Sequence, residues 1–416
     1  MRLLHTSDWH LGHTLRDWAR DHEHERFLAW LLDLVAERGV DALLISGDIF
    51  DTSNPSAAAQ LLWYRFLAQA RRRFPELQIV AIGGNHDAAG RLEAANPVLA
   101  SLAVEVVGAL ARGEGGLDGA IERLIFPIGR GGKTEAWVAA VPFLRPADLP
   151  PRPEGDEGDP LIVGVSEIYA RAQAAMRRRR EPGQAMLAMG HAYMVGGSLS
   201  ELSERKILGG NQHALPATIF DEDLAYVALG HLHLAQRVGA RDHVRYAGSP
   251  IPLSMAEAEY RHQVVLVDLE GETCAAIEPV LVPRSVAALR VPPEGALEPG
   301  PLAAALRALD APASAPEEGW PFLDVAVELT GPAPGLIRQV EEALAGKGVR
   351  LVRVARHTRG RGEALGELIA ARSLRDITPE EVFRERYRRE HEGEPAPALL
   401  EAFAELIELA HEGRGA

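Results

Sequence analysis

Short apolar runs and helical repeats alternate along the first part of the chain. Apolar runs at residues 2–7, 40–45 and 78–82 predict buried strands. Between these runs, residues 21–38 and 57–73 carry apolar side chains at helical spacing. Strands that alternate with helices are typical of an α/β core, so the chain is predicted to begin with one.

The pattern changes after about residue 120. Residues 124–127 and 136–141 predict a hairpin around a Gly-Arg-Gly-Gly turn. Further short strands, with little helix between the last of them, are predicted at residues 185–189, 226–229, 244–247 and 263–269. The sequence therefore predicts a mixed system of sheets that is α/β at the front and β-rich behind.

A break in composition follows residue 280, because residues 293–301 and 311–319 are rich in Pro, Ala, Gly and Glu. Around these segments, a helix, a strand, a second helix and a second strand are predicted at residues 302–309, 322–329, 336–345 and 349–356. We therefore expect three parts: a large domain over 1–282, a small α/β domain over 283–360 and a helical segment over 361–416.

The final segment carries a good helix start. Thr378 can cap the helix, Pro379 suits its first turn, and Glu381 completes a capping box. One apolar stripe follows, formed by Leu399, Leu400, Phe403, Leu406, Ile407 and Ala410. Such a stripe fits a groove on a partner protein, and it fits packing on the chain's own domain equally well.

Composition narrows the class of protein. With 47% hydrophobic and 25% charged residues over 416 positions, the chain is typical of a soluble globular protein of more than one domain. It has no run of about 18 apolar residues, and its first residues are too polar for a secretory signal. The single cysteine, Cys274, excludes an internal disulfide and a cysteine-based metal cage. We expect a cytoplasmic protein without a membrane anchor.

The formal charge of −15, from 59 acidic and 44 basic residues, argues against a nucleic-acid binder. Two arginine runs, at residues 71–73 and 177–180, can override that average locally. Such runs are more often solvated helix faces. Carboxylate ligands in a metal enzyme also lower the formal charge, because the count omits the cations.

Five polar motifs follow predicted strands. They lie at residues 8–10, 47–51, 84–87, 190–191 and 230–233. In α/β sheets, loops at the carboxyl ends of the strands gather ligands around one point. Each motif alone has an ordinary interpretation as a turn or a helix cap, but their joint occurrence at successive strand ends indicates one site.

The residue types in these motifs suit divalent metals. Oxygen and imidazole ligands fit Mn²⁺, Zn²⁺ or Fe²⁺, and a spacing of two points both side chains to the same side of an extended chain. The candidate ligands are Asp8, His10, Asp48, Asn85, His191, His231 and His233. Two ions that share one carboxylate fit seven ligands better than a single ion does.

The five motifs resemble those of the calcineurin-like metallophosphoesterase superfamily. The resemblance is closest to the SbcD family, the nuclease subunits of bacterial SbcC–SbcD complexes, over about residues 1–270. The family-like stretches are residues 5–12, 46–51, 83–87, 225–233 and 246–253. The resemblance implies a four-layer α/β/β/α sandwich of mixed sheets, followed by a small α/β capping domain and a helical tail.

The resemblance also implies roles for individual residues. The first metal would be held by Asp8, His10 and His233, the second by Asn85, His191 and His231, and Asp48 would bridge the two. His86 would lie beside the substrate as a catalytic residue, oriented by Asp87. Two Mn²⁺ ions are the implied cofactors.

The implied function is a two-metal DNA nuclease for repair, recombination and replication. It would act as an exonuclease on DNA ends and as an endonuclease on hairpins or single strands, together with an SbcC-like ATPase. Residues 57–73 and 91–102 would form a homodimer within a heterotetramer, and the tail would dock on the ATPase. The alternatives are a small-substrate enzyme, such as a cyclic-nucleotide phosphodiesterase or phosphatase, and a non-catalytic scaffold.

Other features have simpler interpretations. Residues 131–134, Gly-Gly-Lys-Thr, lack the glycine and the helix of a phosphate-binding loop, so they predict a hairpin turn and no ATP site on this chain. His22 and His24 open a helix and are expected to be solvated. His5 is expected in or beside the core. Trp9 is either a substrate contact or a packing residue, and a packing role as a wall is expected.

Overall fold

The structure is a computed structural model. It describes residues 1–111, 115–152, 155, 158–195, 214–314, 316–331 and 333–358, and short stretches between residues 383 and 403. By contact density the chain divides into two compact units. The first comprises Met1–Arg290, Leu309–Asp324 and Gly346–Arg353, and the second comprises Val291–Ala308, Val325–Ala345 and the described residues after Arg353.

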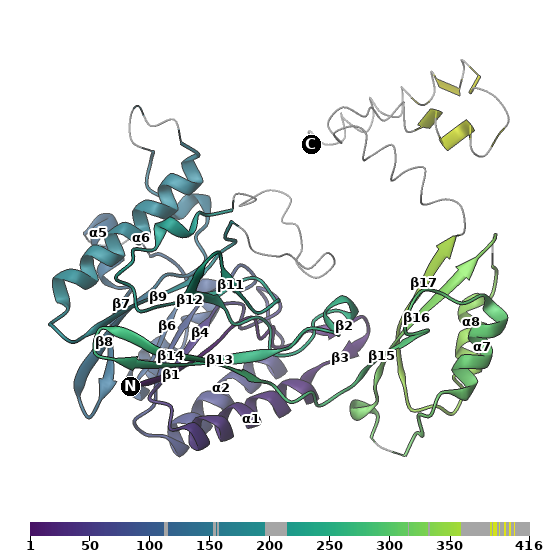
Figure 1. Cartoon of the computed structure of the whole chain (residues 1–416), viewed down its shortest axis with the longest axis horizontal. Coiled ribbons are helices and arrows are strands. Elements are labelled where there is room, and N and C mark those ends of the chain that lie inside the picture. Colours follow the sequence, from purple (N-terminus) through teal and green to yellow (C-terminus); the bar gives the residue numbers. More distant parts are fainter. Residues whose placement is uncertain are drawn as a thin grey trace. The chain divides into compact units, whose positions relative to one another are not determined.

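Two six-stranded mixed sheets form the centre of the first unit (Figure 1). In spatial order, the first sheet contains β14 (Thr273–Leu281), β13 (Gln263–Glu270), β1 (Arg2–Thr6), β4 (Ala42–Ser46), β5 (Gln78–Ile82) and β6 (Val104–Val107). The second contains β11 (Gln236–Val238), β12 (Arg241–Tyr246), β10 (Tyr226–Gly230), β9 (Ala185–His191), β8 (Lys133–Ala140) and β7 (Ile125–Arg130). The central strands β1, β4 and β5 run parallel, as do β8, β9 and β10, so their carboxyl ends share an edge.

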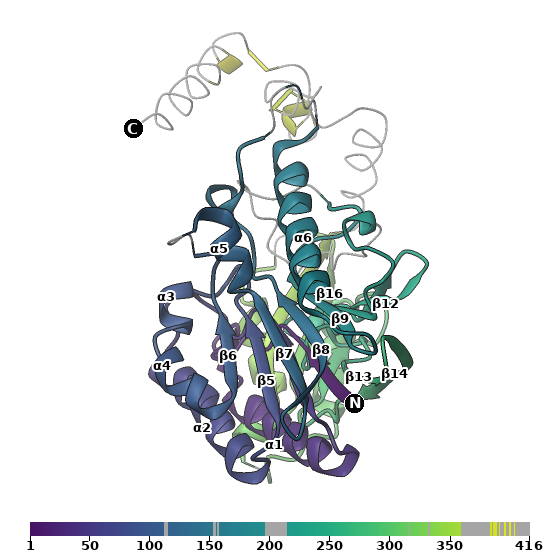
Figure 2. The same cartoon turned by 90° about the vertical axis from the view of Figure 1, so that its left-hand side faces the viewer.

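Helices cover the outer face of each sheet (Figure 2). On the first sheet lie α1 (Asp21–Arg38) and α2 (Ala57–Arg73), and on the second lie α5 (Gly116–Glu122) and α6 (Pro160–Arg179). Local chemistry sets the helix ends: the Ser56 side chain caps α2, and Gly39 ends α1 in the left-handed conformation.

The pleat of β4 shows how the four layers pack. Leu44 belongs to the apolar cluster that includes Val138 and Leu187 of the second sheet. Its neighbours Leu43 and Ile45 belong to the cluster formed with α1 and α2. Successive strand side chains point to opposite faces, so one continuous apolar run supplies two cores. The architecture is the α/β/β/α sandwich predicted from the sequence.

A third, three-stranded sheet has the order β15 (Ala288–Val291), β16 (Phe322–Leu329), β17 (Arg350–Thr358). The helices α7 (Pro299–Ala308) and α8 (Leu336–Ala343) contact each other. In the tail, the rings of Phe383 and Phe403 stack at 4.1 Å. The predicted helix start at Thr378–Glu381 and the last three residues of the predicted stripe lie outside the described residues.

Most predicted elements have their counterpart in the structure, and α1, α2, β5 and β16 match the expected bounds. The longest helix that the sequence pattern does not predict is α6. Asp159 caps this helix and Pro160 occupies its first turn, which is a readable start signal. Among the described residues, no helix combines the length and the apolar character that crossing a bilayer requires.

Candidate metal centre and active site

The seven candidate ligands follow the carboxyl ends of five strands, β1, β4, β5, β9 and β10. The two sheets meet there, because His191 Nδ1 at the end of β9 lies 2.9 Å from the carbonyl oxygen of Ser46 on β4. The backbone N–H of His231, after β10, donates to Oδ1 of Asp8, 223 positions earlier in the chain, at 2.9 Å. The structure therefore brings all seven side chains to one place.

The backbone at this place is strained. Six described residues other than glycine have a positive φ, and four of them are candidate ligands: Asp8 (53°), His10 (47°), Asp48 (48°) and His231 (106°). Residues with a Cβ are destabilised in this region, and such strain gathers at functional sites. The fold therefore holds these four ligands in place against a local conformational preference.

The glycines of the motifs make room for the ligands. A Cβ on Gly84 would lie 2.1 Å from Oδ1 of Asp48. A Cβ on Gly47 would lie 2.2 Å from Nδ1 of His191, and the φ of Gly47 is +88°. Any side chain at either position would displace a ligand, which gives a physical reason for Gly in the Gly-Asp and Gly-Asn motifs.

Asp8, His10 and His233 form the first half of the site, with ligand atoms within 4.8 Å of one another. Neighbours orient each of them: the Ser7 hydroxyl donates to Asp8 at 2.5 Å, and Nδ1 of His233 lies 3.0 Å from the buried carboxylate of Glu257. His10 Nδ1 lies 3.3 Å from Asp51, while its Nε2 is buried without a hydrogen-bond partner. Such an orphaned imidazole nitrogen is costly unless a cation occupies the site.

Asn85, His191 and His231 form the second half. Oδ1 of Asn85 lies 3.0 Å from Nε2 of His191 and 3.0 Å from Nδ1 of His231. Asp48 stands between the halves, because its Oδ2 is 3.3 Å from His191 Nε2 and 3.6 Å from His10 Nε2. All donors are oxygen or imidazole nitrogen, the set that divalent metals such as Mn²⁺ and Zn²⁺ accept. The residues present therefore fit a two-cation centre.

The electrostatics of the site depend on the pair Asp48 and His191. Burial opposes charge on both groups, but each favours the charged form of the other. The pKa of Asp48 falls below its ordinary value, and the pKa of His191 rises to about 9. Burial, together with the nearby His191, lowers the pKa of His231 to about 3. In the absence of a metal, a proton on His191 balances the carboxylate charge.

His86 lies beside the candidate ligands as expected, but the group that orients its ring differs from the expectation. Nδ1 of His86 donates to the carbonyl oxygen of Asp51 at 2.6 Å, so this carbonyl, and not Asp87, orients the ring. The Asp87 carboxylate is buried and accepts backbone N–H bonds from Ile49, Phe50 and Gly84 at 2.9–3.1 Å. Asp87 thus joins two of the motif loops, and His86 stands at the rim, with its ring 4.9 Å from that of His10.

Two residues that contact the candidate ligands were not predicted from the sequence: Asp51 and Glu257. Asp51 closes the Gly-Asp-x-x-Asp motif, so its role beside His10 and His86 had a readable signal. Glu257 lies in a short turn outside every motif, with a side chain that is 0% exposed. No pattern in the sequence marks it, and only the fold reveals its contact with His233.

Of the remaining predictions from the sequence, three are confirmed and one is wrong. His5 lies in the core and bonds Tyr226, and Trp9 is fully buried in the apolar cluster with Phe27, Trp63 and Phe66, so both have the packing roles expected of them. Residues 131–134 form the turn region of the β7–β8 hairpin, as expected. The expectation for His24 was wrong: the side chain is 0% exposed and bonds the Trp9 carbonyl at 2.9 Å.

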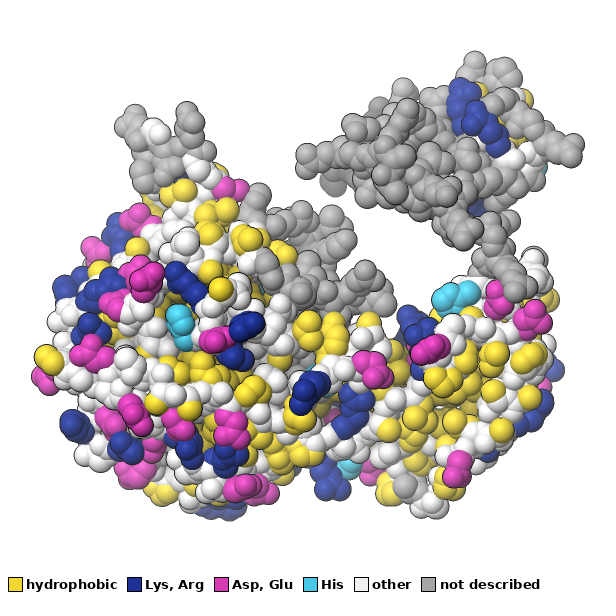
Figure 3. All heavy atoms as spheres, viewed as in Figure 1, with side chains coloured by type: hydrophobic (Ala, Val, Ile, Leu, Met, Phe, Trp, Pro, Cys, Tyr) yellow, Lys and Arg dark blue, Asp and Glu magenta, His cyan; other side chains and the backbone are white. Residues whose placement is uncertain are grey.

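The second arginine run, residues 177–180, is neutralised. Arg177 pairs with Asp221 and Asp223, Arg178 and Arg179 pair with Glu122, and Arg180 pairs with Glu272. On the face shown in Figure 3, basic and acidic side chains are interspersed. This run therefore offers no unpaired positive stripe for nucleic acid.

Comparison with known proteins identifies the family. Residues 1–235 match the model of the calcineurin-like phosphoesterases. Over 360 residues the chain is 44% identical to the SbcD subunit of the SbcCD nuclease of Rhodobacter capsulatus, covering 84% of this chain and 86% of that protein. The chain belongs to the SbcD family of calcineurin-like phosphoesterases. It is therefore a metal-dependent hydrolase of phosphate esters, and the resemblance predicted from its motifs is confirmed.

Further SbcD proteins extend the match. The chain is 31% identical over 393 residues to the SbcD nuclease subunit of Escherichia coli, covering 93% of this chain and 92% of that protein. It is 34% identical over 284 residues to the protein of the same name from Bacillus subtilis, covering 68% and 70%. Residues 289–391 match the model described as type 5 capsule protein repressor C-terminal domain.

Proposed function

We propose that this chain is the nuclease subunit of an SbcC–SbcD-type complex and hydrolyses phosphodiester bonds in DNA. It would act as an exonuclease on ends and as an endonuclease on hairpins or single strands, in the cytoplasm. The observation that carries the proposal is the convergence of seven strand-end ligands on one strained, buried site. The names of the relatives, all of them SbcD subunits of an SbcCD nuclease, support DNA as the substrate.

The cofactors of the proposal are two Mn²⁺ ions. Asp8, His10 and His233 would hold one, Asn85, His191 and His231 the other, with Asp48 shared between them. The two halves of the site and the position of Asp48 support this division. When bound, such cations lower the pKa of water and withdraw charge from phosphate oxygens.

The protein's own contribution to the chemistry centres on His86. A carbonyl oxygen only accepts hydrogen bonds, so the contact with Asp51 fixes the proton on Nδ1. Nε2 is then the atom that exchanges a proton with the substrate. A protonated Nε2 can donate to the leaving 3′ oxygen, which departs poorly as an alkoxide. The Asp48 carboxylate also accepts the His86 backbone N–H at 2.8 Å and so holds the loop against the ligands.

The proposed assembly is a homodimer paired with an SbcC-like ATPase. An apolar hollow of about 480 Å³ lies on α2 and on residues 94–102, which include the short helix α4 (Asn96–Leu99). It is lined by Tyr64, Leu67, Ala68, Val98, Leu99 and Leu102. Val98 is 63% exposed and the nearby Leu61 is 54% exposed. Apolar exposure of this kind marks interaction surfaces, and it coincides with the two segments expected to form the dimer.

We also propose the division into a nuclease domain over 1–282, a capping domain over 283–360 and a partner-binding segment over 361–416. The second family match, which begins at residue 289, supports a separate module after the nuclease domain. A catalytic domain alone would serve a small substrate, so this further module favours the nuclease over a cyclic-nucleotide phosphodiesterase or phosphatase.

A two-substrate assay with Mn²⁺ tests the proposed function. We expect the wild-type chain to cut a linear duplex and to hydrolyse a nitrophenyl phosphodiester, and His86→Ala to lose DNA cutting. An exposed, paired arginine provides the matched control, Arg178→Gln, which should behave as wild type. Hydrolysis of the diester without DNA cutting would indicate the small-substrate enzyme, and no turnover of either substrate would indicate a scaffold.

A further inference from the structure

The segment that follows β8 runs along the rim of the site. The backbone N–H of Phe143 donates to the carbonyl oxygen of Gly83 at 2.8 Å, just before the Gly-Asn-His-Asp motif. The Phe143 ring meets the ring of His191 edge to face, with centroids 6.2 Å apart. The backbone N–H of Arg145 donates to the Asp148 carboxylate at 2.8 Å, which fixes the turn. This rim segment is therefore attached to two parts of the metal centre.

Arg145 is placed beside His86 by this attachment. Its Nη2 donates to the carbonyl oxygen of Asp87, the residue after His86, at 3.3 Å. Its guanidinium also lies over the Phe143 ring, 5.8 Å from the centroid. Arg145 is half-buried, so its position is fixed while part of its surface faces solvent.

The charge of Arg145 has no partner among the described carboxylates. Within the described part of the chain, no carboxylate lies within ion-pair distance of its guanidinium, and its Nε and Nη1 bond no described group. The arginine run 177–180 at the end of α6 differs, because all four of its residues are paired with carboxylates. An unpaired guanidinium fork next to a phosphoesterase centre is suited to bind phosphate oxygens in a bidentate manner.

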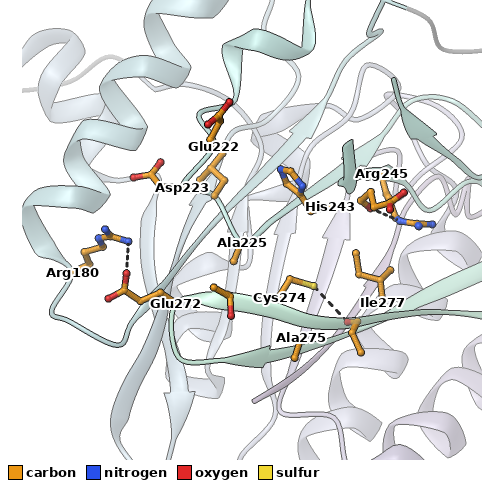
Figure 4. A pocket seen from close by; sticks show the side chains of 14 residues that line it. Arg180, Glu222, Asp223, Ala225, His243, Arg245, Glu272, Cys274, Ala275 and Ile277 are labelled. Atoms are coloured by element: carbon orange, nitrogen blue, oxygen red, sulfur yellow. Dashed lines mark hydrogen bonds and ion pairs between the residues drawn. The ribbon is translucent and has the colours of Figure 1, made fainter. Parts of the chain in front are cut away.

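A cavity of about 660 Å³ elsewhere in the first unit also contains arginines, but carboxylates surround them (Figure 4). It lies near the amino ends of β9 and β10, at the edge opposite to the metal centre, and its charged lining consists of Arg180, Glu222, Asp223, Asp242, Arg245 and Glu272. Acidic groups outnumber arginines there, and Arg180 points to Glu272 at 3.5 Å. That cavity therefore does not suit a phosphate, whereas the rim at Arg145 does.

We propose that Arg145 binds a backbone phosphate next to the scissile phosphate and so anchors the DNA strand at the rim of the site. This inference rests on the proposed nuclease function and adds a substrate-binding residue to it. Because the contact forms equally in the bound and reacting states, its loss should raise KM for DNA and leave kcat unchanged.

Arg145→Gln and Arg145→Lys, with Arg178→Gln as the matched control, test this proposal on the full-length chain with Mn²⁺. For Arg145→Gln we expect KM for a duplex end to rise about tenfold. The slope of log affinity against log salt should fall in magnitude by about 0.9, the value for one lost phosphate contact. Arg145→Lys should keep the slope and recover part of the KM. Nitrophenyl diester hydrolysis and calorimetric Mn²⁺ binding should match wild type in both variants.

Two results would overturn the role of Arg145 alone: an unchanged KM and salt slope in Arg145→Gln, or a parallel loss of diester hydrolysis and Mn²⁺ binding. The latter would show that Arg145 only supports the loop of Asp87. A wild-type chain that hydrolyses the diester and leaves DNA intact would refute the proposed function itself, and the role of Arg145 in binding DNA with it.

Discussion

The metal centre and the arginine run on α6 are both dense in charged side chains, yet they differ in burial, strain and pairing. At the centre, Asp8, Asp48 and His191 are almost fully buried, and His10 keeps an orphaned ring nitrogen. On α6, the side chain of Arg178 is 64% exposed and pairs with Glu122 at 2.8 Å. The arginines of the run have carboxylate partners within the protein, whereas the buried polar groups of the centre need a cation as a partner. What distinguishes the metal centre is that buried carboxylates and an orphaned imidazole nitrogen lie together on a strained backbone, whereas the charges of the arginine run are exposed and paired.

The largest loss of activity should come from a change at Asp48, the proposed shared ligand. Asp48→Asn keeps the size of the side chain but removes the charge that would hold both cations, so we expect activity on DNA and on the diester to fall by at least about 1000-fold. Steady-state rates with Mn²⁺ measure this, with circular dichroism to confirm folding. Activity within tenfold of wild type would show that Asp48 is not the shared ligand.

The next largest effect should come from Glu257, which contacts the candidate ligand His233 without being a candidate ligand itself. Glu257→Gln weakens the acceptor that orients His233, so Mn²⁺ affinity should fall by about 10- to 100-fold, the range for lost outer partners of metal ligands. Isothermal titration calorimetry measures the affinity. Glu259, two residues on and exposed, gives the matched control Glu259→Gln, which should leave affinity unchanged. Equal Mn²⁺ affinities in the two variants would show that Glu257 does not support metal binding.

The pairing of Asp48 with His191 predicts a pH dependence of metal binding. His191 must lose its proton to bind a cation, and its pKa without metal is about 9. Below that pH each binding event releases this proton, so affinity should rise about tenfold per pH unit until the free imidazole predominates. Calorimetry in buffers of different ionisation enthalpy counts the protons. An affinity that stays flat between neutral pH and pH 9 would contradict the pairing.

His24 gives a smaller effect, on stability. Burial lowers its folded-state pKa to about 3, so the unfolded chain binds the extra proton first as pH falls below about 6.5. The native state therefore loses stability on acidification, and the loss from this residue should reach about 1.4 kcal/mol between about pH 7.5 and about pH 5.5. Urea unfolding of wild type and His24→Gln measures this loss. The difference between their free energies of unfolding should narrow by that amount over this pH range. A gap that is constant with pH would contradict a neutral, buried His24.

The smallest effect belongs to the arginine run. Arg178→Gln breaks an exposed ion pair, which is worth at most about 1 kcal/mol. We expect DNA cutting within twofold of wild type and a nearly unchanged salt dependence, since the charge was already paired. A clear fall in the salt slope would show that α6 binds DNA and would remove the contrast with the metal centre.

Much of this picture could be predicted from the sequence where a pattern is local. The bounds of α1 and α2 follow from apolar periodicity, and the seven ligands follow from short motifs at strand ends. The helix α6 went unassigned because small residues such as Ala172 and Ala175 supply part of its buried face and weaken the apolar signal. Its cap at Asp159 was the available clue.

The rest depends on contacts between distant parts of the chain. His24 opens a helix in sequence, and its hydrogen bond to the carbonyl oxygen of Trp9, 15 residues earlier, forms only in the fold. Glu257 lies 24 residues from His233, in a turn without a motif. The role of the Asp51 carbonyl in orienting His86 involves a backbone atom, which no side-chain pattern encodes. Such groups become visible only when the fold brings them together.

The most direct test of the central claim is a crystal structure of the chain soaked in Mn²⁺, with anomalous data collected at the manganese edge. We expect two anomalous peaks, one among Asp8, His10 and His233, the other among Asn85, His191 and His231, both in contact with the Asp48 carboxylate. A single peak, or peaks that Asp48 does not join, would contradict it.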